Sequence, residues 1–190
     1  MQQLSQRSVL IGLTLAVLMA ATRMHHFGSA LHLPDASLAV FMLAGFFISS
    51  TLFFVGMLLE AGALDYVAIT QLGVSDWCVT PAYWFLIPTY GVLWYAGRHY
   101  ARIHQHSVRS LGVFSGIAFA AVSAAFFISN GAFYLFSGRY PNLNVAEYAA
   151  RVMQYYPQYL TGGLLYLFCA AALYAVLATR APATTKTTGE

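Results

Sequence analysis

The longest apolar stretch of the chain, residues 38–69, limits most strongly what this sequence can fold into. It runs for 32 residues and carries only two charged side chains, both acidic. A helix needs about 20 apolar residues to cross the hydrocarbon core of a membrane, so this stretch is too long for a single crossing. The polar triplet Ser49-Ser50-Thr51 near its middle predicts a tight turn between helices over residues 36–49 and 51–69.

The rest of the chain has the same character. Of its 190 residues, 59% are hydrophobic and 8% are charged, whereas soluble domains carry about 25% charged residues. The sequence therefore predicts an all-α integral membrane protein with a single domain over residues 1–180 and a disordered tail over 181–190. The small net charge of +3 is scattered along the chain, which argues against a nucleic-acid partner. The six predicted transmembrane helices cover residues 4–22, 36–49, 51–69, 81–99, 110–134 and 158–178, with a bend at Pro88 and a short amphipathic helix over 145–155.

The distribution of basic residues predicts the orientation of these helices. Cytoplasmic loops of membrane proteins carry an excess of Lys and Arg. With both termini in the cytoplasm, the two sides hold six and three basic residues, and this arrangement is the one we expect. The inner side then carries Arg7, Arg98, Arg102, Arg109, Arg180 and Lys186, and the outer side carries Arg23, Arg139 and Arg151.

This orientation gathers the unusual polar residues at the outer face. They are His25, His26, Asp65, Cys78, Tyr83 and Arg151. Ionisable groups at a membrane boundary are costly unless they are paired or used. Two interpretations follow: an ion pair between Asp65 and Arg151 that closes the bundle, or an aromatic-lined pocket with a few polar anchors.

Cys78 is the most specific of these residues because it lies in the polar loop 70–81 and not in a helix. The second cysteine, Cys169, lies about 16 Å deeper along its predicted helix, which is too far for a disulfide. A thiolate is a good ligand for a soft transition metal. The alternative is that Cys78 is an unreactive thiol, and Cys169 is predicted to be a small hydrophobic residue in a helix.

The histidines do not support haem binding. One group lies in the loop 23–35 and the other, from His99 to His106, lies at the opposite membrane face, so no helix has the central histidine that a membrane cytochrome needs. Glu60, in the middle of a predicted span, is either hydrogen-bonded to a neighbour or part of a route through the membrane. Gly12, Ala16 and Ala20 form a small-residue face that suits close packing, either within the monomer or against a partner.

Three segments carry a resemblance to a known family: MHHFGSALHLPDASLAVFMLAGFF at 24–47, LLEAGALDYVAI at 58–69 and SDWCVTPAYWFLIPTYG at 75–91. Together they resemble the BtuM family of cobalamin transporters. The family comprises proteobacterial relatives of the substrate-binding S-components of energy-coupling-factor transporters. The resemblance covers roughly residues 8–178, and the loop with its lone cysteine is its specific part.

The resemblance implies an S-component-like bundle in the bacterial cytoplasmic (inner) membrane, with a corrinoid bound at the periplasmic face. Cys78 would be the axial cobalt ligand, and His26, Asp65, Tyr83 and Arg151 would belong to the binding pocket. Family members of this type are solitary and are linked to removal of cyanide from cyanocobalamin by the same cysteine. The face formed by Gly12, Ala16 and Ala20 resembles the one that S-components present to a membrane partner, so an ATPase module is compatible with this sequence but not required.

Two other functions remain as alternatives. An S-component for another vitamin would have no need of the soft ligand at Cys78. A membrane redox or haem protein would need histidines within the spans.

Overall fold

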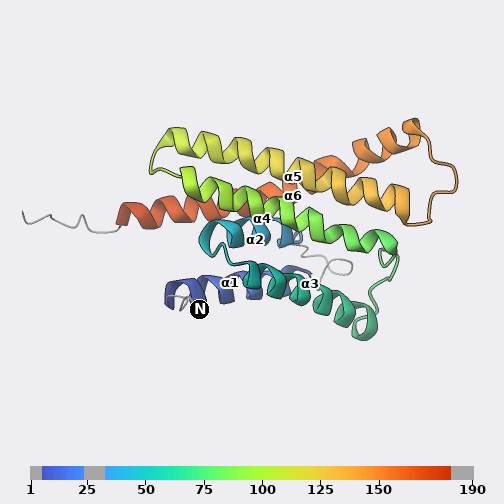
Figure 1. The fold of residues 1–190 in the computed structure, drawn as a ribbon, viewed down its shortest axis with the longest axis horizontal. Helices are drawn as coiled ribbons and strands as arrows, with labels where there is room; N and C mark the ends of the chain where they lie inside the picture. The colour runs from blue at the N-terminus through green and yellow to red at the C-terminus, as the bar shows by residue number, and fades with distance from the viewer. Residues whose placement is uncertain (1–5, 24–32, 181–190) are drawn as a thin grey trace, which may run out of the picture.

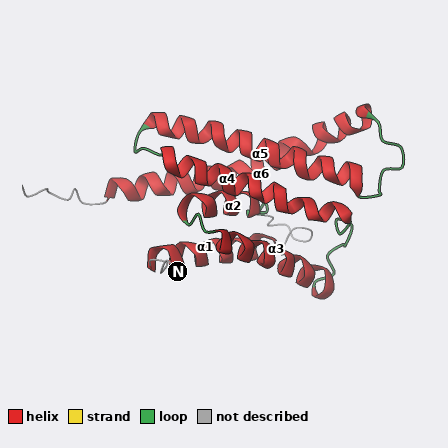
Figure 2. Cartoon of the chain, in the orientation of Figure 1, coloured by secondary structure: helices red, strands yellow, loops and turns green. Residues whose placement is uncertain are grey.

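Helices account for most of the described chain. A computed structural model describes residues 6–23 and 33–180, and within these ranges there are six α-helices, one short 3₁₀-helix and no strand (Figures 1 and 2). The predicted tail 181–190 and the predicted site residue His26 lie outside the described residues. The elements are α1 (Gln6–Arg23), α2 (Ser37–Phe47), α3 (Thr51–Gln71), the 3₁₀-helix η1 (Pro81–Phe85), α4 (Leu86–Ile103), α5 (Val108–Phe136) and α6 (Val145–Arg180).

The helices run along the long axis of the molecule, and both ends of the described chain lie at the same end of the bundle (Figure 1). Helices α1 and α3 lie side by side, α2 and α4 form the middle of the bundle, and α5 and α6 cover the other side. The loop 104–107 lies at the end where α1 begins and α6 finishes. The loops 72–80 and 137–144 lie at the opposite end, so the polar loop around Cys78 is far from the histidine-rich loop.

The predicted turn between residues 49 and 51 is confirmed. Ser49 has a positive φ of 53°, which reverses the chain direction after α2. Ser50 then caps α3, since its side chain accepts a hydrogen bond from the backbone N–H of Phe53 at 3.3 Å. A serine oxygen at this position satisfies one of the N–H groups that a helix leaves unpaired at its start.

The tightest packing in the bundle is between α2 and α4. A Cβ atom on Gly45 would lie 2.0 Å from the carbonyl oxygen of Trp94, and one on Gly97 would lie 1.9 Å from that of Met42. Only glycine permits the two backbones to approach so closely. Most of α2 is consequently buried, and it forms the centre of the hydrophobic core.

The predicted break between the helices over 145–155 and 158–178 is wrong. Residues 145–155 and 158–178 form one continuous helix, α6, which accommodates Pro157 in its interior. A proline removes one backbone hydrogen bond from a helix. Helical residues lie on both sides of Pro157, so α6 continues through it. Pro88 lies in the first turn of α4, which follows η1 directly. The change from 3₁₀ to α geometry falls at Leu86, two residues before Pro88.

Three helices are long and apolar enough to cross a membrane: α3, α5 and α6, the last over Val145–Leu177. Helix α2 is also apolar but has 11 residues, which rise only about 16 Å. On α1, Gly12 is buried, and a Cβ atom added to it would meet the ring of Phe53 at 3.1 Å. Gly12 therefore packs within the monomer, as one of the two interpretations of the small-residue face predicts.

Candidate functional site

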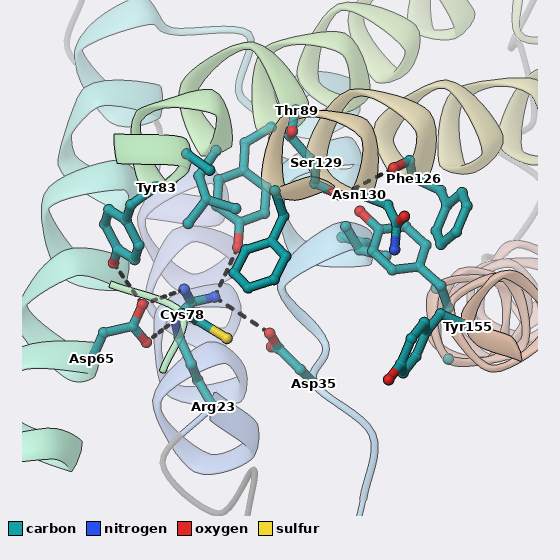
Figure 3. Close-up of a pocket in the computed structure, with 18 of the residues that line it drawn as sticks. Arg23, Asp35, Asp65, Cys78, Tyr83, Thr89, Phe126, Ser129, Asn130 and Tyr155 are labelled. Atoms are coloured by element: carbon teal, nitrogen blue, oxygen red, sulfur yellow. Dashed lines mark hydrogen bonds and ion pairs between the residues drawn. The ribbon is translucent and has the colours of Figure 1, made fainter. Parts of the chain in front are cut away.

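A cavity of about 540 Å³ lies at the end of the bundle that carries the loop around Cys78 (Figure 3). This volume is within the range of small-molecule sites, about 300–1,000 Å³. Its walls come from every α-helix, from η1 and from the loop 72–80. The aromatic lining consists of Tyr83, Tyr90, Phe126, Phe133, Tyr155 and Tyr159, and the strongly polar groups are Arg23, Asp35, Asp65, Asn130, Arg151 and Gln158.

Arg23, the last residue of α1, organises the polar side of this cavity. Its guanidinium donates from Nε and Nη2 to the two oxygens of Asp65, both at 2.6 Å. Its Nη1 donates to Asp35 at 3.3 Å and to Tyr90 Oη at 2.8 Å. The Arg23 side chain is only 9% exposed, so its charge depends on these partners rather than on water.

Asp65 ties three elements together. In addition to the two bonds from Arg23, it accepts a hydrogen bond at 2.6 Å from the hydroxyl of Tyr83 on η1. Helix α3 is thereby joined to α1 and to the segment that follows the Cys78 loop. Because both carboxylate oxygens are engaged, Asp65 serves to position its neighbours and has little capacity left for a ligand.

The loop that carries Cys78 is held by a turn and by a cation. The carbonyl of Asp76 accepts the N–H of Val79 at 2.8 Å, which places Trp77 and Cys78 at the centre of a four-residue turn. The guanidinium of Arg139 lies over the Trp77 ring, 4.1 Å from its centroid. This cation–π contact joins the loop 72–80 to the loop 137–144.

The thiol of Cys78 is exposed and lines the cavity on the side of Asp65 and Arg23, as Figure 3 shows. Partial desolvation raises the pKa of this thiol, and the charge of Asp65 acts in the same direction. Arg151 and Arg139 act to lower that pKa. The free protein therefore carries a thiol at neutral pH, and a metal that binds there must displace its proton.

Arg151 lies among aromatic rings. Its guanidinium is 4.8 Å from the ring centroid of Tyr155 and 5.1 Å from that of Phe133. Its Nε donates to Asn130 at 3.2 Å, and its Nη1 donates to the hydroxyl of Tyr140. Within the described ranges, no carboxylate forms an ion pair with Arg151, so its charge faces the cavity without a neutralising partner.

Four of the five predicted site residues line this one cavity: Asp65, Cys78, Tyr83 and Arg151. The predicted ion pair between Asp65 and Arg151 is wrong, because Asp65 pairs with Arg23. Cys169 is exposed on α6 and is not part of the cavity lining. The two cysteines are both free.

Sequence reasoning missed four polar residues of the site: Arg23, Asp35, Asn130 and Gln158. The sequence indicated Arg23 only as a positive charge on the outer side of the membrane. The signal available was that it follows an apolar helix directly, where an arginine needs a partner. Asn130 and Gln158 lie in apolar segments of α5 and α6, and the polarity of their side chains was the only signal.

The described residues contain no group of three or more His, Cys, Asp or Glu side chains that could hold a metal ion by themselves. The thiol of Cys78 is a single soft donor on the cavity wall. It suits a metal whose remaining ligands arrive with it, such as a metal in a macrocycle.

No protein-family model and no curated protein matches this chain. The resemblance to the BtuM family therefore rests on its three segments. All three contribute to the same cavity: 24–47 through Asp35 and Leu38, 58–69 through Asp65, and 75–91 through Cys78 and Tyr83.

Proposed function

We propose that this protein takes up cobalamin or a related corrinoid across the bacterial cytoplasmic membrane, with Cys78 as an axial ligand of the cobalt. The observation that carries the proposal is the lone exposed thiol on the wall of a cavity built from all three segments that resemble the BtuM family. The corrinoid enters from the periplasmic side and is the transported substrate, not a resident cofactor.

The proposal includes six membrane crossings with both termini in the cytoplasm. Three helices meet the length and hydropathy of a membrane span, and both ends of the described chain lie at one end of the bundle. A periplasm-dependent reporter fused after Ser137 should be active, whereas one fused after His104 should be inactive. The reverse pattern would place the cavity on the cytoplasmic side and would exclude uptake from the periplasm.

The side chains of the cavity suit a corrinoid. Its aromatic walls can cover the faces of a large ring, and the amides on a corrin rim match the hydrogen-bonding capacity of Asn130 and Gln158. Cobalt(III) in a corrin has two axial positions, and a thiolate from Cys78 can occupy one of them.

Removal of cyanide from cyanocobalamin would follow from the same bond. Donation from the Cys78 thiolate weakens the cobalt–cyanide bond on the opposite face. That bond breaks with both electrons leaving on cyanide, which takes up the proton displaced from the Cys78 thiol. A water molecule takes the vacated position, and the cobalt stays in the +3 state. This ligand substitution needs no reductant.

The visible spectrum of the purified protein with cyanocobalamin tests the proposal. A cobalt–thiolate bond should change the corrin absorption relative to free cyanocobalamin, and Cys78→Ser should abolish both the change and the release of cyanide. The matched control is Cys169→Ser, which should behave like the parent protein because Cys169 lies outside the cavity. If Cys78→Ser retains the altered spectrum and the cyanide release, this thiol does not hold the cobalt.

A further inference from the structure

A second cavity, of about 590 Å³, lies at the opposite end of the bundle, next to the loop 104–107. It lies among α2, α4, α5 and α6, and its walls are mainly aromatic and aliphatic. The residues that define these walls are Phe46, Phe47, Phe114, Phe168 and Tyr174. Its polar groups are concentrated in the loop, so one end is polar and the remainder is apolar.

The exposed part of the lining has a polar and an apolar portion. Three loop residues are exposed, Gln105, His106 and Ser107, and so are five apolar residues of α5 and α6: Val108 (87%), Leu111 (48%), Phe168 (41%), Ala172 and Ala175. In a membrane, the apolar portion faces lipid and the polar loop faces water.

Because the cavity is open to the surface, its apolar walls are exposed rather than packed. Apolar surface left in contact with water is unfavourable. Water does not fill such a space stably, because each water molecule needs two to four polar partners. The molecules available beside the opening are lipids, whose acyl chains match the apolar walls.

We propose that this cavity binds one acyl chain of an anionic phospholipid, whose phosphate lies against Arg102 and Arg109. The inference rests on the membrane placement proposed above and is independent of the corrinoid. It assigns a second ligand site to the end of the bundle opposite Cys78.

Basic residues on either side of the loop 104–107 in the sequence determine the choice of headgroup. Arg102 and Arg109 are exposed, flank the loop that lines the cavity, and form no ion pair within the described ranges. His104 is committed elsewhere, since its two ring nitrogens contact Tyr100 Oη at 2.9 Å and Tyr174 Oη at 3.2 Å. Desolvation and the neighbouring His106 lower the pKa of His104, so the ring is neutral at pH 7.

The proposed orientation places this loop in the cytoplasm, where the membrane leaflet is rich in anionic lipids. A zwitterionic headgroup would gain little from two arginines. The site should therefore prefer phosphatidylglycerol to phosphatidylcholine.

Native mass spectrometry of the full chain, purified in detergent and mixed with each lipid, tests the inference. The parent protein should retain one phosphatidylglycerol and should retain phosphatidylcholine more weakly. The double variant Arg102→Gln with Arg109→Gln should lower the affinity for phosphatidylglycerol about 25-fold, since each arginine near an anionic headgroup contributes about a fivefold factor. Arg7→Gln removes an exposed charge from α1, which lines no part of this cavity, and should leave lipid retention unchanged.

A second variant tests the acyl-chain cavity separately from the headgroup. Ala172 lines the cavity and is exposed, so Ala172→Trp should block the opening without disturbing the core, and retention of both lipids should fall. Equal retention of the two lipids by the parent protein, no retained lipid, or normal retention by Ala172→Trp would each overturn the inference. The corrin spectrum, recorded on the same samples, reports separately on the first cavity.

Discussion

Asp65→Ala should destabilise the protein severely, because Asp65 is the main partner of a buried cation. The substitution removes three short hydrogen bonds, two from Arg23 and one from Tyr83. Among the described residues, Arg23 is left with one carboxylate, that of Asp35 at 3.3 Å. Loss of one partner from a buried ion pair costs about 3–5 kcal/mol. For a chain of this length, that loss corresponds to a Tm lowered by about 10 °C, measured by thermal unfolding in detergent.

Asp76→Ala is the matched control, because it removes the same charge from an exposed position in the loop 72–80. Its Tm should stay within about 2 °C of the parent, as is usual for surface substitutions. The double variant Arg23→Gln with Asp65→Asn should lose less than the sum of its single variants, since one interaction is lost only once. Equal melting of the Asp65 and Asp76 variants, or strict additivity in the cycle, would refute the role assigned to this network.

Three further predictions concern binding and packing. Arg151→Gln should weaken corrinoid binding about tenfold in titration calorimetry, as expected for a lost charged hydrogen bond. The Tm from melting curves should change little, because Arg151 has no carboxylate partner among the described residues. The corrinoid affinity should rise about tenfold per pH unit below the raised pKa of Cys78 and level off above it, because cobalt displaces the thiol proton; Cys78→Ser should make this profile flat. Gly45→Ala should destabilise the protein by about 1–3 kcal/mol or more in a melting experiment, because the new methyl group would collide with the α4 backbone. Gly56→Ala is the control and should be neutral or stabilising, because nothing lies within 4 Å of its added Cβ.

Local patterns in the sequence predicted most of the helices well. The turn at Ser49 to Thr51 follows from two facts visible in the sequence, an apolar stretch too long for one crossing and a polar triplet at its centre. The continuity of α6 could not be predicted from such a local pattern. Whether Pro157 ends a helix depends on whether the flanking helical segments are stable enough to tolerate the lost hydrogen bond. The sequence alone does not give the relative size of these two effects.

The site shows a similar division. That Asp65, Cys78 and Tyr83 lie near one another follows from their closeness in sequence at the end of α3 and the start of η1. The pairing of Arg23 with Asp65 joins residues 42 positions apart. Arg151 was an equally reasonable partner on charge alone, and only the packing of α1 beside α3 decides between them.

The close crossing of α2 and α4 has a mechanical consequence. Leu38 at the start of α2 lines the cavity near Cys78, while Met42, one turn further along, lines the other cavity. A partition of about 6 Å along α2 thus separates the two spaces. At Gly45 and Gly97 the two backbones touch with no side chains between them that could change rotamer. This pair therefore cannot widen by side-chain rearrangement, and any passage that joins the two spaces must open by displacing whole helices.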